Sequence, residues 1–271
     1  MKEFYYLNGE IVASEQAKIH VSDLGLLRGY GIFDFFRAMD GQAIFLEDHL
    51  DRLENSARLM HLPLLQTRQQ ISEAILEIIR LHPIPMLGVK VVLTGGYSPD
   101  GYQPAETPNL VIFGKPFTFG NPKAGLKWMS IAYEREIPEI KTTNYVVPIR
   151  HLPALKAGGF DDVLYHKNDS VSESSRSNVF IIKNEKVITP KNGVLFGITR
   201  KHVLAVARQH FEVEERDISV AEFFAADEIF TTGSTKRITP VTQVDGHIFN
   251  LGKVTQKLQA LFLEHESGVL V

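Results

Sequence analysis

Five short polar segments concentrate the residue types that could do chemistry in this chain of 271 residues. The segments are His49–Leu53, Glu139–Tyr145, Val171–Phe180, Gly197–Arg200 and Thr232–Pro240. Thr199 begins an amphipathic helix, so its hydroxyl and the nearby backbone N–H groups form a natural anion site. The start of this helix is therefore a candidate place for an anionic group.

Several common catalytic motifs are missing from the sequence. No His-Glu-x-x-His occurs and the ten histidines are scattered, so no metal site is predicted. The segment Gly29-Tyr30-Gly31 lacks the third glycine of a dinucleotide fingerprint, and no phosphate loop or Gly-x-Ser-x-Gly elbow is present. Without cysteine, the chain has no thiolate nucleophile and no disulfide. Simple nucleotide-binding and hydrolase functions are excluded.

The composition is that of an average globular protein, with 44% hydrophobic and 23% charged residues. A formal charge of −3 gives no field that would gather nucleic acid or an anionic membrane. Charges and tyrosines stand at the N-terminus where a signal peptide has an apolar core, and no run is long enough to span a membrane. We therefore expect a cytoplasmic protein.

The first half of the chain reads as a hairpin-rich sheet with two amphipathic helices. Turn signals at Asn8-Gly9 and Asp40-Gly41 follow strand-like runs, and apolar residues then recur at helical spacing. The predicted strands are Phe4–Leu7, Gly31–Ala38, Val89–Leu93 and Leu110–Phe113, and the predicted helices lie at Leu46–Met60 and Ile71–Ile79. A Gly- and Pro-containing stretch at 116–125 is the best linker, so we place a domain boundary near residue 120.

The second half alternates strands and helices without an internal repeat. The predicted elements are strands at Leu126–Tyr133, Asp162–His166, Val179–Lys183 and Glu228–Thr232, and helices near Pro148–Ala157, Thr199–His210 and Val254–Glu264. This interleaving predicts an α+β or mixed α/β fold.

In order and spacing, the five segments resemble those of class IV aminotransferases, the fold-type IV enzymes that use pyridoxal 5′-phosphate (PLP). That family includes branched-chain and D-amino acid aminotransferases and aminodeoxychorismate lyase, and the resemblance runs from Asn8-Gly9 to Asp245-Gly246. It implies a two-domain subunit, with a smaller domain at 1–120 and a larger PLP-binding domain at 121–271. It also implies a homodimer that acts on amino acids and 2-oxo acids.

The resemblance assigns two central roles. Lys141 matches the Schiff-base lysine, an amine that binds the cofactor and then moves the substrate's α-proton. Taken alone, it would be an ordinary surface lysine. Glu173 matches the carboxylate that faces the pyridine nitrogen and keeps the ring protonated. Its alternative role is that of a loop glutamate fixed by neighbouring hydrogen bonds.

The remaining cofactor roles follow from the same resemblance. Arg52, Ile198, Thr199 and Ser234 match the phosphate site, although a surface ion pair and a helix cap would explain Arg52 and Thr199 equally simply. Tyr145 resembles the tyrosine that hydrogen-bonds the cofactor's ring oxygen. Branched-chain enzymes place that tyrosine one residue later, so aromatic packing stays an alternative.

Substrate choice is ambiguous in this sequence. The pattern of Gly29–Arg37 favours branched-chain substrates, but the Tyr-Ile-Arg-Pro-Leu segment of those enzymes is replaced by Lys90–Gly96. The carboxylate arginine of D-amino acid aminotransferases aligns with Gly95 and is absent as well. Unclaimed cations then remain for a rearranged carboxylate site: Arg28, Lys90, Lys236 and Arg237. Arg28 precedes a predicted strand in a glycine-flanked loop that could reach a neighbouring subunit.

Eight residues are assigned to the substrate side. They are Arg28, Tyr30, Phe33, Arg37, Lys90, Gly233, Thr235 and Lys236. The preferred function is a branched-chain-like aminotransferase, and a D-amino acid aminotransferase is the first alternative. Aminodeoxychorismate lyase ranks third, because its lysine segment typically carries an arginine where Tyr145 stands. A non-catalytic small-molecule sensor would not need Lys141 and Glu173.

Overall fold

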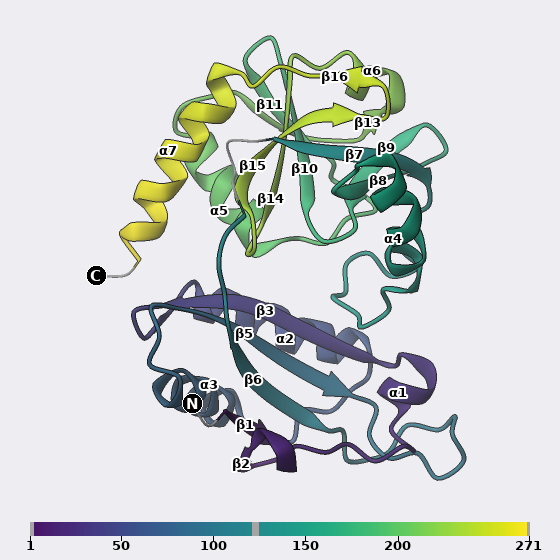
Figure 1. Ribbon diagram of the computed structural model, residues 1–271, viewed down its shortest axis with the longest axis vertical. Helices are drawn as coiled ribbons and strands as arrows, with labels where there is room; N and C mark the ends of the chain where they lie inside the picture. The colour runs from purple at the N-terminus through teal and green to yellow at the C-terminus, as the bar shows by residue number, and fades with distance from the viewer. Residues whose placement is uncertain (1–2, 121–124, 270–271) are drawn as a thin grey trace. The chain divides into compact units, whose positions relative to one another are not determined.

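The computed structural model describes residues 3–120 and 125–269, which divide into two compact units. The first holds residues 3–118 and 140–144, and the second holds 119–120, 125–139 and 145–269. In Figure 1 the first unit runs from purple to teal and the second from teal to yellow. Both units combine helices with sheets, which confirms the predicted mixed α/β fold. The domain assignment of 1–120 and 121–271 stays a prediction.

The first unit is built on a six-stranded antiparallel sheet. Its strand order is β2 (Glu10–Ala13), β1 (Phe4–Leu7), β6 (Leu110–Pro116), β5 (Met86–Thr94), β3 (Gly31–Met39) and β4 (Gln42–Ala43). The helical segments are η1 (Ser14–Gln16), α1 (Leu24–Arg28), α2 (Leu46–Leu59) and α3 (Arg68–Leu81). Strands β3 and β5 pair along nine residues each, and form the centre of the unit.

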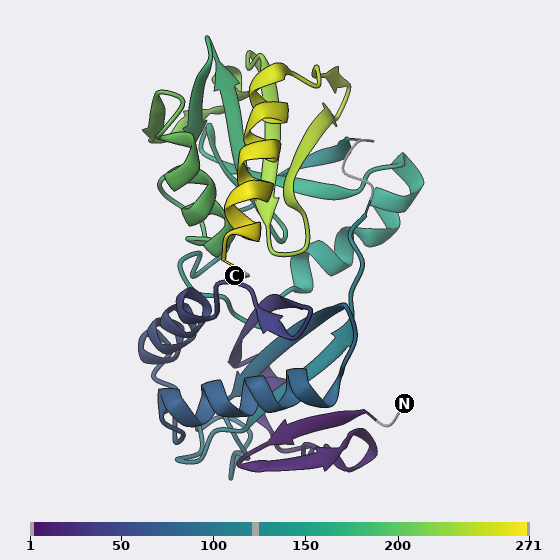
Figure 2. The same cartoon turned by 90° about the vertical axis from the view of Figure 1, so that its left-hand side faces the viewer.

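Helices α2 and α3 bury their apolar stripes against one face of this sheet (Figure 2). Leu50 and Leu53 of α2 and Ile75 and Ile78 of α3 are all buried, as a period of 3.6 residues requires. Thr67 and Gln70 form a reciprocal capping box that starts α3. Both helices confirm the predicted ones. Alternate residues of β3 and β5 point to the other face of the sheet.

Six strands of the second unit form a closed barrel. The ring runs β10 (Asn178–Lys183), β14 (Glu228–Gly233), β15 (Arg237–Val244), β7 (Leu126–Ala132), β8 (Asp162–Lys167) and β9 (Ser170–Ser174). The pairing of Asn178 with Glu173 joins β10 back to β9 and closes it. A core around the fully buried Trp128 holds the barrel strands together.

Short strands and four helices complete the second unit (Figure 1). The strands are β11 (Lys186–Thr189), β12 (Val213–Glu215), β13 (Ile218–Ser219) and β16 (His247–Ile248). The helices are α4 (Val146–Gly158), α5 (Ile198–Ala207), α6 (Val220–Phe224) and α7 (Lys253–Ser267). The predicted helices near 148–157, 199–210 and 254–264 are therefore confirmed. Helices α5 and α7 both pack against β14.

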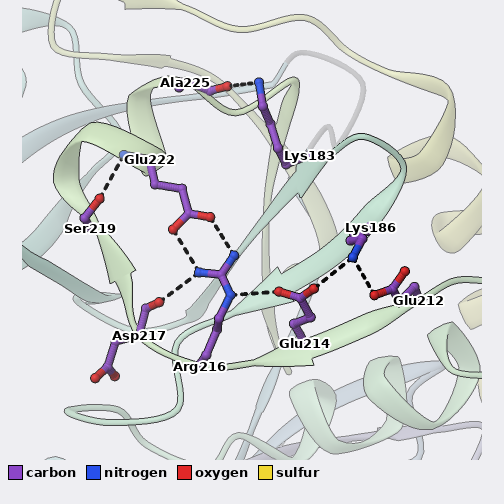
Figure 3. Close-up of polar contacts among 9 residues, drawn as sticks. All are labelled: Lys183, Lys186, Glu212, Glu214, Arg216, Asp217, Ser219, Glu222 and Ala225. Carbon is purple, nitrogen blue, oxygen red and sulfur yellow. Dashed lines mark hydrogen bonds and ion pairs between the residues drawn. The ribbon is translucent and has the colours of Figure 1, made fainter.

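Ion pairs tie the short strand β12 to its neighbours (Figure 3). Arg216 Nε donates to Glu214 Oε2 at 2.7 Å, and its two terminal nitrogens donate to Glu222 at 2.8 and 2.6 Å. Lys186 Nζ lies 2.5 Å from a Glu212 oxygen and 3.2 Å from a Glu214 oxygen. Each partly exposed ion pair contributes little to the free energy of unfolding, so the main effect of the network is to hold β12 in place beside β11 and α6.

Candidate active site

Lys141 belongs to a short segment that extends the sheet of the first unit. The Phe33 N–H donates to the Lys141 carbonyl at 2.9 Å, and Ile32 and Thr142 form a bridge beside it. The Thr143 hydroxyl donates to the Gly29 carbonyl at 2.9 Å. These bonds fix the backbone on both sides of Lys141, so its side chain leaves the sheet from a defined position.

Two ammonium groups lie over the ring of Phe33 in the first unit. Lys141 Nζ is 4.5 Å and Lys90 Nζ is 5.0 Å from the ring centroid. An aromatic face attracts a cation at such distances. Burial lowers the pKa of Lys90. Lys90 has no hydrogen bond or ion pair to another residue within the described parts of the chain, which leaves this half-buried ammonium available to an anion.

Arg52 is held by a buried carboxylate on β3. Its Nε and Nη2 donate to the two oxygens of Asp34, both at 2.8 Å, and His49 Nδ1 lies 2.6 Å from Asp34 Oδ1. Burial acts to raise the pKa of Asp34, but Arg52 and His49 outweigh it and hold that pKa far below its usual value. Burial lowers the pKa of His49 in spite of Asp34, whose carboxylate its Nδ1 faces.

The arrangement around Arg52 leaves part of the guanidinium available. Two of its five N–H groups are committed to Asp34, while Nη1 has no partner within the residues that the structure describes. The side chain is only 11% exposed, and its direction is fixed by the bidentate pair. Arg52 is therefore a pre-oriented cation, as a phosphate site requires.

Glu173 is a buried carboxylate of the second unit, and both of its oxygens accept hydrogen bonds. Arg135 Nε donates to Oε1 at 2.7 Å, and the Leu195 backbone N–H donates to Oε2 at 3.0 Å. The Asn178 side chain donates to the Leu195 carbonyl at 2.6 Å. Glu173 and Asn178 thus converge on the loop that leads into α5.

Helix α5 begins beside this loop without a side-chain cap. Gly197 is its N-cap residue and has no side chain to accept from the first turn, while Ile198 and Thr199 are buried there. A Cβ atom on Gly197 would overlap Asn178 Oδ1, so any larger residue at this position would force the Asn178 side chain to shift. The backbone N–H groups of a first helical turn have no acceptor inside the helix, and they attract anions.

Thr232 adds an unsatisfied hydroxyl near the same loop. It pairs directly with Asn178 across β10 and β14, so the two side chains point to the same face. Its Oγ1 is buried and has no hydrogen-bond partner among the described residues. A buried hydroxyl without a partner is rare in a folded protein unless a ligand or water supplies one. Together with the uncapped start of α5, it fits a phosphorylated cofactor.

The β14–β15 turn holds the other predicted residues of the second unit. The Lys236 N–H donates to the Gly233 carbonyl at 2.9 Å, which closes the turn that contains Ser234 and Thr235. Lys236 Nζ lies 3.1 Å from the buried carboxylate of Asp162. The expectation that Lys236 is an unclaimed cation is therefore wrong.

Arg237 is likewise committed, because its guanidinium pairs with the buried Glu266. The expectation that it is unclaimed is also wrong.

The last predicted residues take several positions. The Tyr30 hydroxyl donates to the Met60 carbonyl, which links the residue before β3 to the C-cap of α2. Arg37 is buried, with Nη1 3.8 Å from Met39 Sδ, and Arg28 is exposed at the end of α1. Tyr145 is the N-cap residue of α4. Their roles toward a ligand stay predictions.

Sequence reasoning missed several partners of the site. Asp34 and His49 lay inside segments already singled out, and a charged residue within an apolar strand was an available signal. Asn178 and Thr232 also lay in chosen segments. No local signal pointed to Arg135, which lies 38 positions from its partner in the chain.

Comparisons with known proteins decide the family. A family model described as amino-transferase class IV matches residues 31–244. The chain belongs to the class IV aminotransferases. A branched-chain-amino-acid aminotransferase of Pseudomonas aeruginosa is 30% identical over 285 residues, covering 97% of this chain and 92% of that protein. A D-alanine aminotransferase of Staphylococcus haemolyticus is 26% identical over 272 residues, covering 95% of each chain.

The fold of this class IV aminotransferase matches solved structures over nearly its whole length. The crystal structure of a T.th. branched-chain amino acid aminotransferase, complexed with N-(5'-phosphopyridoxyl)-L-glutamate, superposes with a TM-score of 0.91 at 23% identity. The alignment covers 99% of this chain and 95% of that one. The predicted fold type, the enzyme class and the likeness to branched-chain aminotransferases are thereby confirmed.

No helix within the described residues is long and apolar enough to cross a membrane. No group of three or more His, Cys, Asp or Glu side chains is placed to hold a metal ion in the same residues.

Proposed function

We propose that this chain binds PLP through Lys141 and transfers amino groups between branched-chain-like amino acids and 2-oxo acids. The observation that carries the cofactor assignment is the cluster in the second unit. There, Glu173 accepts a hydrogen bond from Leu195, in the loop that leads to the uncapped start of α5, and the unsatisfied Thr232 hydroxyl lies opposite Asn178, which donates to the same loop. The T.th. enzyme of the same fold was crystallised with a phosphopyridoxyl amino acid, which supports the same ligand class.

The residues divide the work by their chemistry. When bound, PLP supplies an electrophilic carbon and a ring that withdraws electrons from the substrate's α-carbon. Lys141 would provide the amine that holds the cofactor and would take the proton from that α-carbon. Glu173 would accept a hydrogen bond from the ring nitrogen and keep the proton on that nitrogen. In the second unit, the first turn of α5 and Ser234 would bind the phosphate and Tyr145 would donate a hydrogen bond to the ring oxygen; in the first unit, Arg52 would offer its cation to a phosphate.

Lys90 is the residue best placed within the first unit to bind a substrate carboxylate. Its ammonium is half-buried over Phe33, and burial already lowers its pKa, so an incoming carboxylate would compensate for lost solvation. Phe35 and Val92 lie on the same face of the sheet and suit an aliphatic side chain. Arg28 is exposed, and we assign it a carboxylate contact in a neighbouring subunit.

A D-amino acid aminotransferase is the second candidate, and the similarity to the Staphylococcus haemolyticus enzyme favours it. The surroundings of Gly95 show whether the substrate carboxylate could be bound by an arginine at that position. A Cβ atom at Gly95 would stand 2.7 Å from a ring carbon of Tyr30 and 3.0 Å from Leu24 Cβ. A side chain as large as arginine would require both to move. Under either candidate, the carboxylate site must therefore be built from other cations.

One experiment tests the function and its chirality together. PLP-loaded protein is mixed with single L- and D-amino acids, and the visible band of the bound cofactor is followed. We expect rapid decay with L-leucine, L-isoleucine and L-valine. Decay with D-alanine alone would select the second candidate. Borohydride reduction followed by peptide mapping should place the pyridoxyl group on Lys141, and a label on another lysine would refute the central assignment.

We also propose a homodimer in the cytoplasm. Helix α4 exposes an apolar stripe, with Val146 68%, Ile149 61% and Leu152 56% exposed in the single chain. Residues three apart lie on one helix face, and such a patch is typical of a subunit interface. Light scattering of the native protein and of Ile149→Glu tests this. The native chain should measure as a dimer and the variant should shift toward monomer.

A further inference from the structure

The ion pair between Arg135 and Glu173 lies beyond the residues assigned so far. Arg135 Nε donates to Glu173 Oε1 at 2.7 Å, and the two side chains are only 15% and 5% exposed. Arg135 comes from the loop that follows β7, whereas Glu173 lies on β9. A pair so far from solvent is screened weakly and depends on its geometry.

The Arg135 guanidinium is itself held in place. It also donates to the Pro138 carbonyl of its own loop, so it cannot swing away without losing two hydrogen bonds. The Leu195 N–H fixes the second oxygen of Glu173. Both oxygens of the Glu173 carboxylate thus accept hydrogen bonds, from donors in two different loops. These bonds restrict rotation about the Cγ–Cδ bond of Glu173.

We propose that Arg135 is a positioning residue, which presents the Glu173 carboxylate to the ring nitrogen of the cofactor. A buried carboxylate without a cation is costly, and Arg135 offsets that cost before any cofactor binds. Each carboxylate oxygen has more than one lone-pair site, so a third donor can still be accepted. The inference rests on the proposed contact between Glu173 and the ring nitrogen.

The contact with the ring nitrogen can be measured without turnover. The apoenzyme is titrated with PLP and with 1-deazapyridoxal 5′-phosphate, in which carbon replaces the ring nitrogen. Both ligands carry the phosphate and the aldehyde, so general losses of folding or phosphate binding cancel in the ratio of their dissociation constants. A hydrogen bond between charged groups should favour PLP roughly ten- to hundredfold in the native protein.

The native protein and four variants give a decisive comparison. Glu173→Gln should reduce the preference for PLP strongly, and an unchanged ratio there would refute the role of Glu173 itself. If that role holds, Arg135→Gln should lower the ratio at least roughly fivefold, because the carboxylate loses its charged donor. Arg135→Lys, which keeps the charge, should restore part of the preference.

Arg216→Gln is the matched control, since Arg216 pairs with Glu214 and Glu222 in the ion-pair network of Figure 3. This variant should keep the native preference for PLP over the deaza analogue. If Arg135→Gln keeps the native preference for PLP while Glu173→Gln loses it, the role of Arg135 is refuted and that of Glu173 stands. A ratio above the native value would also refute the role of Arg135, because Arg135 would then compete with the ring for the carboxylate.

Discussion

Replacing Asp34 by alanine should destabilise the first unit severely. Asp34 is 1% exposed and is the shared acceptor for Arg52 and His49. The substitution leaves the buried Arg52 guanidinium without its counter-ion. Removing one partner of a buried pair costs about 3–5 kcal/mol, several times the cost of losing an exposed pair. We therefore expect a loss of that size in the free energy of unfolding of the apoenzyme.

The pH dependence of this loss follows from the pKa of Asp34. That pKa is depressed in the folded protein, so the carboxylate stabilises the fold at every pH above its unfolded value of about 4. The stabilisation declines as the pH falls through the lower folded value. The difference between native protein and variant should therefore be full at pH 7 and should shrink only in strong acid.

Urea unfolding followed by far-UV circular dichroism measures the effect. Asp51→Ala is the control, because Asp51 lies on α2 like Arg52 but is 66% exposed in its pair with Arg68. Its loss should stay below about 1 kcal/mol. Equal losses in the two variants at pH 7 would show that the buried pair contributes no more than a surface one, and the reasoning would fail.

Three further substitutions test the site. Glu173→Gln should retain PLP in an absorbance titration but lose turnover by several orders of magnitude, and near-normal turnover would make Glu173 structural. Gly197→Ala should weaken PLP binding, because its Cβ would overlap Asn178, whereas Gly246→Ala has open space around it and should bind normally in the same titration. Arg28→Ala should weaken the binding of an amino acid by on the order of 2–5 kcal/mol, and so slow its half-reaction, while sparing a simple amine. Equal losses with both substrates would refute a carboxylate contact.

Local sequence patterns predicted most of the helices. The stripes of α2 and α3 and the turn at Asp40-Gly41 all depend on neighbours within a few residues. Asp40 has a φ of +47° and Gly41 a φ of +82°, as the turn signal required. Such features are set by backbone and side-chain chemistry that the sequence displays directly.

The barrel was not predictable in the same way. It closes through the pairing of Asn178 with Glu173 and through a parallel pairing between β15 and β7, which are more than 100 residues apart. Periodicity indicates that a strand exists but not which strand it joins. The same limit explains the unexpected partners of the cations, since Lys236 meets Asp162 only once the barrel has formed.

The placement of residues 140–144 limits how this protein can be divided. These five residues pack with the first unit, although the chain reaches them only after it has built β7 in the second. A fragment that ends at residue 120 would lack the hydrogen-bond partner of the Phe33 N–H and the Thr143 contact with Gly29. Complementation from two separately made halves should therefore succeed better with a cut between Asn144 and the start of α4, although the first half would then also carry β7.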